Sequence, residues 1–143
     1  MANSERRVIE PESLEATVAQ LKQTGKQVVL TAGRFDALDE TQIKLLQRAR
    51  ALGDALIVVL YNDSPDWQAR AERIGGLECV DYLMVLPEDA LVPLLQQLQP
   101  PYYVLLGDYT ERDLPAVEAV MASGGFTVVL PRMSASSPTK SDA

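Results

Sequence analysis

Residues 28–63 read VVLTAGRFDALDETQIKLLQRARALGDALIVVLYND, and this stretch decides the fold. The runs at 28–31 and 55–61 predict two buried strands, because parallel strands covered on both faces read as continuous apolar segments. Between them, the turn at 32–36 leads into a helix at about 40–52 with an apolar stripe at Ile43, Leu46 and Ala49. Gly53 stands where a left-handed helix cap is expected. The stretch therefore predicts a strand–helix–strand unit of a parallel sheet.

The same alternation continues along the chain. Helices are expected at 11–24, from 62 toward 73, at 87–98 and at 114–123, and strands at 82–86, 102–106 and 127–130. Pro93 is expected to distort the helix at 87–98 if it lies inside it. The pattern predicts an α/β fold: a doubly wound (Rossmann-like) five-stranded parallel sheet with helices on both faces. We expect a single domain at 8–133, a flexible N-terminus at 1–7 and a flexible polar tail at 134–143.

Composition narrows the possible functions. The chain has 143 residues, a formal net charge of −7, one cysteine and no histidine. Scattered lysines and arginines argue against a nucleic acid or an acidic membrane as partner. No apolar run is long enough to span a membrane and no leader opens the chain, so we expect a cytoplasmic protein. Without histidine, the usual general acid–base group near neutral pH is missing. The lone Cys79 excludes an intramolecular disulfide, and its apolar neighbours predict a core position.

Ligands of open parallel sheets bind beyond the carboxyl ends of the strands. The turns at 32–36, 62–65 and 107–109 are therefore the expected ligand side. At the first turn, backbone N–H groups and the dipole of the following helix favour an anion. This signal is weak by itself, because most doubly wound proteins have such a turn.

A series of segments, in order, resembles the cytidylyltransferase-like nucleotidyltransferases, most closely the heptose 1-phosphate adenylyltransferases that form ADP-heptose. In that family the first strand ends in TNG within a GxFDxxHxGH motif, and a later strand ends in KGGDY. This chain has SLEATVAQLKQTGK at 13–26, TAGRFD at 31–36, LECVDYLMVL at 77–86, LLGDY at 105–109 and GGFTVVLP at 124–131. The resemblance spans about residues 8–130 and implies self-association into a homodimer. It also implies nucleotide or phosphate contacts at Ala32, Gly33, Arg34, Phe35, Asp36, Gly107 and Asp108.

This chain departs from the family pattern at the positions whose side chains carry out the family's chemistry. The two motif histidines correspond to Asp39 and Gln42, and the lysine of KGGDY corresponds to Leu105. The asparagine of TNG is Ala32, and the phosphate-binding Ser/Thr motif has only a faint counterpart at 137–140. An ionised aspartate donates no hydrogen bond and adds negative charge where a triphosphate would lie. Losing one such donor typically costs about 2.7–4 kcal/mol of transition-state stabilisation. No confident catalytic residue remains, and no metal ligand is assigned.

Asp39 and Gln42 also have the spacing of a helix capping box, which fits them better than a repurposed catalytic or metal-binding role. Asp36 could hold the turn or contact a ligand. Arg34 could be a solvated turn residue or an anion contact. Both alternatives stay open at this point.

Three other residues allow two interpretations each. Asp63 and Asp108 end strands on the ligand side, where isolated acids are commonly turn formers. They could hold Mg²⁺ only with a phosphate to share it. Trp67 could anchor an interface or pack its helix against the core.

Three functions follow from these observations. The first is a degenerate nucleotidyltransferase-like domain, kept as a non-catalytic binding, regulatory or scaffolding subunit with a protein partner or a second copy. The second is an active enzyme with a rebuilt site, which would use Mg²⁺ and transfer AMP or CMP from ATP or CTP to a sugar or polyol phosphate. The third is a receiver-like signalling domain, which is disfavoured because no acidic pair follows the first strand and no lysine ends a late strand.

Overall fold

The computed structural model describes residues 11–36, 38–107 and 110–131. Its elements are α2 (Pro11–Gln23), β1 (Val28–Gly33), α3 (Glu40–Arg50), β2 (Ala55–Tyr61), α4 (Trp67–Gly75), β3 (Tyr82–Leu86), η1 (Glu88–Ala90), α5 (Leu91–Leu98), β4 (Tyr102–Leu106), η2 (Glu111–Asp113), α6 (Leu114–Ala122) and β5 (Phe126–Leu130). The flexible ends expected at 1–7 and 134–143, together with Asp108, lie outside the described residues.

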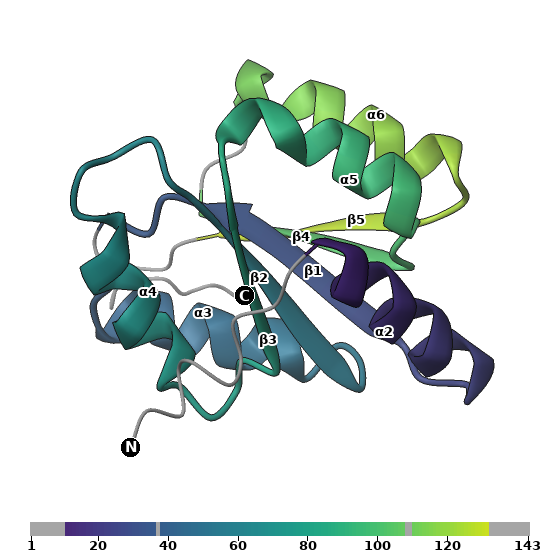
Figure 1. Cartoon of the computed structure of the whole chain (residues 1–143), viewed down its shortest axis with the longest axis horizontal. Coiled ribbons are helices and arrows are strands. Elements are labelled where there is room, and N and C mark those ends of the chain that lie inside the picture. Colours follow the sequence, from purple (N-terminus) through teal and green to yellow (C-terminus); the bar gives the residue numbers. More distant parts are fainter. Residues whose placement is uncertain (1–10, 37, 108–109, 132–143) are drawn as a thin grey trace, which may run out of the picture.

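The five strands form one parallel sheet in the order β3-β2-β1-β4-β5, so the predicted α/β fold is confirmed. Helices α2, α5 and α6 cover one face of the sheet, and α3 and α4 cover the other (Figure 1). From β1 the chain moves outward to β2 and β3, and it then returns to the other side of β1 with β4. The strand order therefore reverses between β1 and β4, and ligands of doubly wound sheets bind at such a reversal.

Alternate residues of each strand face opposite helical layers, which divides the core in two. In β1, Val28 and Leu30 pack toward α2, α5 and α6, while Val29 packs toward α3 and α4. All seven residues of β2 are buried, as its continuous apolar run predicts. Thr31 is the one buried polar residue of the described core, and its Oγ1 donates to the Val104 carbonyl at 2.7 Å. This bond joins β1 to β4 where the strand order reverses.

Helix α4 begins later than predicted. It starts at Trp67 rather than near residue 62, because residues 64–66 form a bend and a turn before the helix. Trp67 is half-buried and packs against the α3–α4 layer, which confirms its helix-packing interpretation. Cys79 is half-buried beside the same layer, so the prediction of a core position was only partly right.

The cap at the end of α3 was predicted wrongly, and the helix at 87–98 differs in form from the prediction. Gly53 does not have positive φ, and α3 ends at a right-handed Ala51 cap. Glycine is needed there for another reason: a Cβ at residue 53 would lie 2.6 Å from the Gln27 carbonyl oxygen. The helix predicted at 87–98 is a 3-10 turn, η1, followed by α5, and Pro93 lies in the first turn of α5, where an α-helix leaves the backbone N–H groups unpaired.

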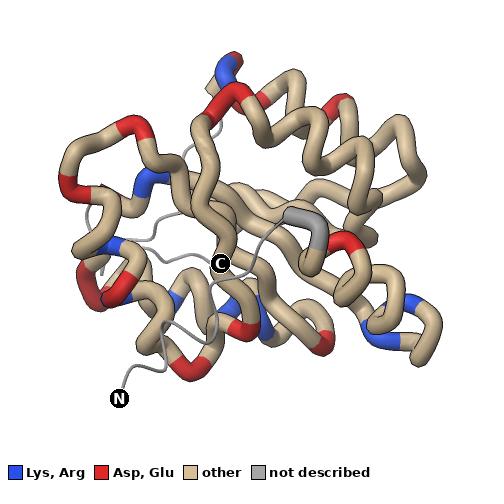
Figure 2. Tube along the Cα trace, viewed as in Figure 1, with Lys and Arg blue, Asp and Glu red and all other residues tan. Residues whose placement is uncertain are grey.

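Charged residues are spread over the described chain, with acidic and basic positions interspersed (Figure 2). None of the helices in the described ranges is both long enough and apolar enough to cross a lipid bilayer.

Candidate functional site

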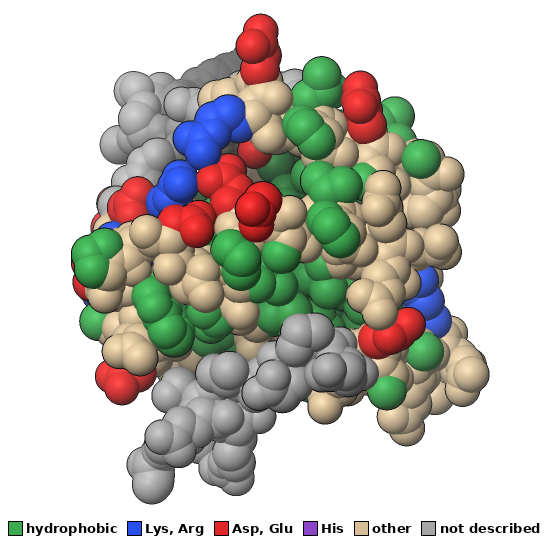
Figure 3. All heavy atoms as spheres, turned by 45° about the horizontal axis from the view of Figure 1, so that its top comes forward, with side chains coloured by type: hydrophobic (Ala, Val, Ile, Leu, Met, Phe, Trp, Pro, Cys, Tyr) green, Lys and Arg blue, Asp and Glu red, His purple; other side chains and the backbone are tan. Residues whose placement is uncertain are grey.

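A cleft of about 510 Å³ opens at the carboxyl ends of β1, β2 and β4, where the strand order reverses. The turn after β1 forms one wall, and the starts of α5 and α6 form the opposite wall. Figure 3 shows basic and acidic side chains gathered around a hollow on this side of the molecule, with hydrophobic side chains beside it. The turn at 32–36 thus lies at the carboxyl ends of the strands, as predicted.

Within this turn, Phe35 and Gly33 have unusual surroundings. Phe35 has φ 55°, a left-handed conformation that costs a bulky residue about 1–3 kcal/mol, and its buried ring holds the turn against the α3–α4 layer. A Cβ at Gly33 would meet only the Phe35 ring, at an ordinary 3.6 Å. No described protein atom therefore requires glycine at position 33, and the space beside it belongs to the cleft.

Asp39 is the N-cap of α3. Its Oδ1 accepts the backbone N–H of Gln42 at 2.9 Å, so the capping role predicted for this carboxylate is confirmed. Gln42 itself lines a smaller cavity of about 190 Å³ on the α3 side of the same turn, together with Leu106. The two positions that correspond to the family's histidines therefore lie at the helix start, beside the turn.

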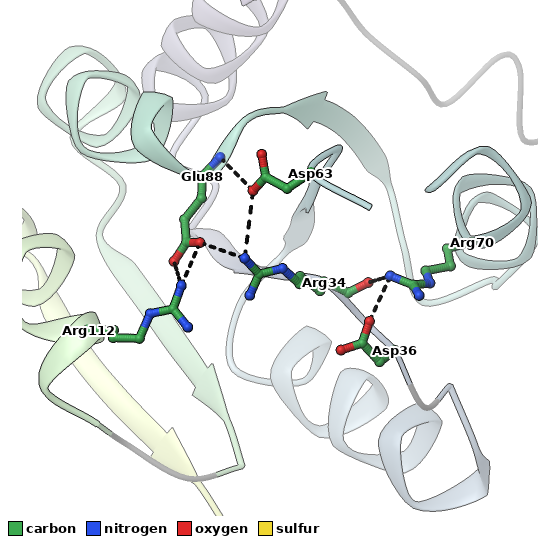
Figure 4. A network of polar contacts seen from close by, with 6 residues as sticks. All are labelled: Arg34, Asp36, Asp63, Arg70, Glu88 and Arg112. Atoms are coloured by element: carbon green, nitrogen blue, oxygen red, sulfur yellow. Dashed lines mark hydrogen bonds and ion pairs between the residues drawn. The ribbon is translucent and has the colours of Figure 1, made fainter. Parts of the chain in front are cut away.

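A network of ion pairs crosses the mouth of the cleft (Figure 4). Glu88, in the turn after β3, pairs with Arg34 at 3.1 Å and with Arg112 at 2.9 Å. Asp63 lies 3.9 Å from the Arg34 guanidinium and accepts the Glu88 backbone N–H at 3.3 Å. Arg34 is thus a paired residue on the cleft, and both of its predicted roles, solvated turn residue or anion contact, stay open.

Asp36 points away from this network, toward α4. Its Oδ1 lies 2.7 Å from Arg70 Nη1, and Arg70 also donates to the Arg34 carbonyl at 3.3 Å. The Arg70 side chain is only 15% exposed, and its contacts hold the turn at 32–36 against α4. This contact supports the turn-holding interpretation of Asp36.

Two tyrosines, Tyr61 at the end of β2 and Tyr103 in β4, form part of the cleft lining. Burial raises the pKa of both phenols, and the carboxylates of Glu88 and Asp113 raise it further. Neither hydroxyl has a hydrogen-bond partner among the residues that the structure describes. Both stay protonated at neutral pH and can donate to a ligand in the cleft.

The described residues do not fit a nucleoside triphosphate with Mg²⁺ in the way the family resemblance implies. Asp39 is engaged at the helix end, and Leu105 is buried against the α5–α6 layer without a charge to offer. Among residues 11–36, 38–107 and 110–131, no group of three or more acidic or cysteine side chains could hold a metal ion. Asp63 and Glu88 lie close together, but both carboxylates face the Arg34 guanidinium.

The cleft brings together only some of the residues singled out from the sequence. Ala32, Gly33, Arg34, Phe35 and Asp36 line it, whereas Gly107 and Leu105 do not. Gly107 has φ 100°, so it is a turn glycine at the end of β4.

Sequence reasoning missed most of the other residues that line the cleft, among them Glu88, Arg112, Tyr61 and Tyr103. A signal for Glu88 was present, because the turn after β3 must lie at the same sheet edge as the other three turns. Tyr61 ends a buried strand, which also places it at that edge. The position of Arg112 follows from how η2 packs, which local sequence does not reveal.

The fold and the site define a class of protein: a doubly wound domain with a nucleotidyltransferase-type turn after its first strand. Part of the bifunctional protein HldE from Bradyrhizobium diazoefficiens is 34% identical over 91% of this chain and 29% of that protein. HldE from Yersinia pestis is 33% identical over 86% of this chain and 28% of its own length. The chain thus spans less than a third of the curated relatives it matches.

The chain is homologous to this part of HldE, which agrees with its resemblance to the cytidylyltransferase-like nucleotidyltransferases. A solved structure, the lipopolysaccharide core biosynthesis protein from Thermoplasma volcanium, superposes with a TM-score of 0.65. It is 22% identical and covers 76% of this chain and 99% of its own, which supports the fold. No protein-family model matches the chain.

Proposed function

We propose that this chain is a non-catalytic nucleotidyltransferase-like domain of the ADP-heptose synthase type, retained as a binding, regulatory or scaffolding subunit. The observation that carries the proposal is the use of Asp39, whose carboxylate accepts the Gln42 N–H and caps α3. A carboxylate committed to the helix start offers a triphosphate no donor, and its negative charge opposes a phosphate there. Its partner is another protein or a second copy of the chain.

Leu105 supports the same proposal. A cation at this position in β4 would stabilise charge on a transferring phosphoryl group, since such enzymes act by positioning and electrostatic stabilisation. The leucine side chain is instead 6% exposed and packs in the hydrophobic core. A lysine at position 105 would bury a charge among apolar side chains, so the packing of this core disfavours a cation there.

The test is a search for turnover by the full chain. Purified protein is mixed with Mg²⁺, with ATP or CTP, and with a panel of sugar 1-phosphates and polyol phosphates, and pyrophosphate release is measured. We expect no release above the protein-free control. Robust turnover with any pair of substrates would refute the proposal.

A second measurement separates a nucleotide-binding subunit from a pure protein-interaction module. Calorimetric titration of ATP and CTP into the wild-type chain is compared with the double variant Asp39→His, Gln42→His. If the cleft retains room for a nucleotide, the double variant binds it more tightly than the wild type. Equal absence of binding in both assigns the domain to protein contacts alone.

An active enzyme with a rebuilt site is the second candidate. The observation that favours it is the pair Arg34 and Arg112 at the mouth of the cleft, because guanidinium groups stabilise phosphate charge. Such an enzyme would transfer AMP or CMP to a sugar or polyol phosphate. The pyrophosphate assay decides between the two.

A further inference from the structure

A carboxylate lies at the mouth of the cleft where an anionic ligand would otherwise meet two arginines. Glu88 Oε1 lies 3.1 Å from Arg34 Nη2 and 2.9 Å from Arg112 Nη2, and Oε2 lies 3.1 Å from the same Arg112 nitrogen. Two guanidinium groups thus converge on one oxygen atom (Figure 4). Arginines hold an oxygen of a phosphate-type anion in the same manner.

The two arginines reach this point from separate parts of the chain. Arg34 follows β1, Arg112 lies in η2 before α6, and Glu88 is 54 residues from the first and 24 from the second. Asp63 holds the Glu88 backbone through its N–H at 3.3 Å, which places the carboxylate between them. The arrangement therefore depends on the complete fold and closes across the cleft from two walls.

The contacts of Glu88 are also weak enough to be exchanged. The side chains of Glu88 and Arg34 are about one-third exposed and that of Arg112 is 66% exposed. Ion pairs at such exposure contribute little to stability because solvent screens them. A dianionic group, with more charge and more acceptor oxygens than one carboxylate, can compete for the same donors.

We propose that Arg34 and Arg112 form a binding pair for a phosphate-type anion, and that Glu88 occupies this pair as an internal competitor. The cleft then takes the anion only when the Glu88 side chain turns away. The anion is a free phosphate or diphosphate, or the phosphate group of a nucleotide. The inference does not depend on whether the domain catalyses nucleotidyl transfer, because it concerns binding.

The test compares two variants that change net charge equally. Glu88→Gln keeps the side-chain size and removes the competitor's charge, whereas Asp89→Asn removes one charge from the next residue, which lines the same cleft and has no ion pair in the described chain. Inorganic pyrophosphate is titrated by calorimetry at low salt, and thermal unfolding checks that each variant is folded. We expect Glu88→Gln to bind about tenfold more tightly than wild type, equivalent to about 1.4 kcal/mol, and Asp89→Asn to gain far less.

Equal gains in the two variants would overturn the proposal, since the effect would then be one of net charge. No gain in Glu88→Gln would also overturn it. The double variant Glu88→Gln, Arg112→Gln must lose the gain, and a gain that survives there contradicts the role of Arg112.

A parallel titration of the Glu88→Gln protein with ATP identifies the source of the group. Tighter binding of ATP than of pyrophosphate assigns it to a nucleotide, and the reverse assigns it to a free anion. Both results support the arginine pair, and failure of both anions to bind refutes it. Pyrophosphate release is measured in a separate assay. The binding titrations can therefore be interpreted even if that assay refutes the non-catalytic proposal.

Discussion

Replacing Asp39 with alanine removes the side chain that caps α3 and leaves the helix backbone otherwise unchanged. The lost interaction is one hydrogen bond of 2.9 Å from the Gln42 N–H to an exposed carboxylate at the start of an 11-residue helix. Loss of an N-cap acceptor costs about 1 kcal/mol, within a range of roughly 0.5–2 kcal/mol. For a domain of this size we expect the midpoint of thermal unfolding to fall by about 3–5 °C.

The matched control is Asp39→Asn, which removes the charge but keeps a capping oxygen. Asparagine and aspartate cap about equally well, so this variant should stay within a few tenths of a kcal/mol of wild type. Both are measured by urea unfolding followed by circular dichroism, with the same m-value required for comparison. Wild-type stability in Asp39→Ala, or equal destabilisation in both variants, would refute the capping argument and reopen a role for the carboxylate charge.

Further predictions concern the close approach at Gly53, the buried hydrogen bond of Thr31 and the titration of the two tyrosines. Gly53→Ala should lower the free energy of unfolding by about 1–3 kcal/mol, because the new Cβ would lie 2.6 Å from a backbone carbonyl oxygen. In the same urea titration Gly33→Ala should be near neutral, because its Cβ would have its nearest contact at 3.6 Å. Thr31→Val deletes a buried hydrogen bond of 2.7 Å and should cost about 1 kcal/mol by chemical denaturation, and an unchanged midpoint would contradict this. The pKa values of Tyr61 and Tyr103 are raised in the folded state, so above about pH 10 the unfolded chain loses phenol protons that the folded chain keeps. The free energy of unfolding should therefore be unaffected by these groups below about pH 10 and should decline as the pH rises above it. Tyr61→Phe should flatten that decline, and an equal slope in the variant would count against the shift.

Most of the fold could be predicted because its signals are local. The seven apolar residues at 55–61 are all buried, and a continuous apolar run needs no knowledge of its neighbours to be assigned to an internal parallel strand. The start of α4 was less predictable. Asn62, Asp63, Ser64 and Asp66 can all begin a helix, and only tertiary packing selects the start at Trp67.

The candidate site was predicted in part. The turn at 32–36 and the capping role of Asp39 follow from short-range patterns, so sequence alone could find them. The pairing of Glu88 with Arg34 and Arg112 joins residues 24 and 54 positions apart, and no local pattern encodes such convergence. The prediction of a left-handed cap at Gly53 was wrong for a related reason. A glycine required by the close approach of another backbone segment looks the same in sequence as one required by a left-handed turn.

The strand order also determines when the domain can be completed during synthesis. β1 is made first, yet one of its two neighbours is β4, and the Thr31–Val104 bond spans 73 residues. Each parallel pairing needs a crossover, so no hairpin can nucleate the sheet, and contacts of this range slow folding. A nascent chain that ends before residue 102 leaves the innermost strand with an open edge. We therefore expect the domain to fold as one unit after β4 has emerged, with chaperone protection most needed until then.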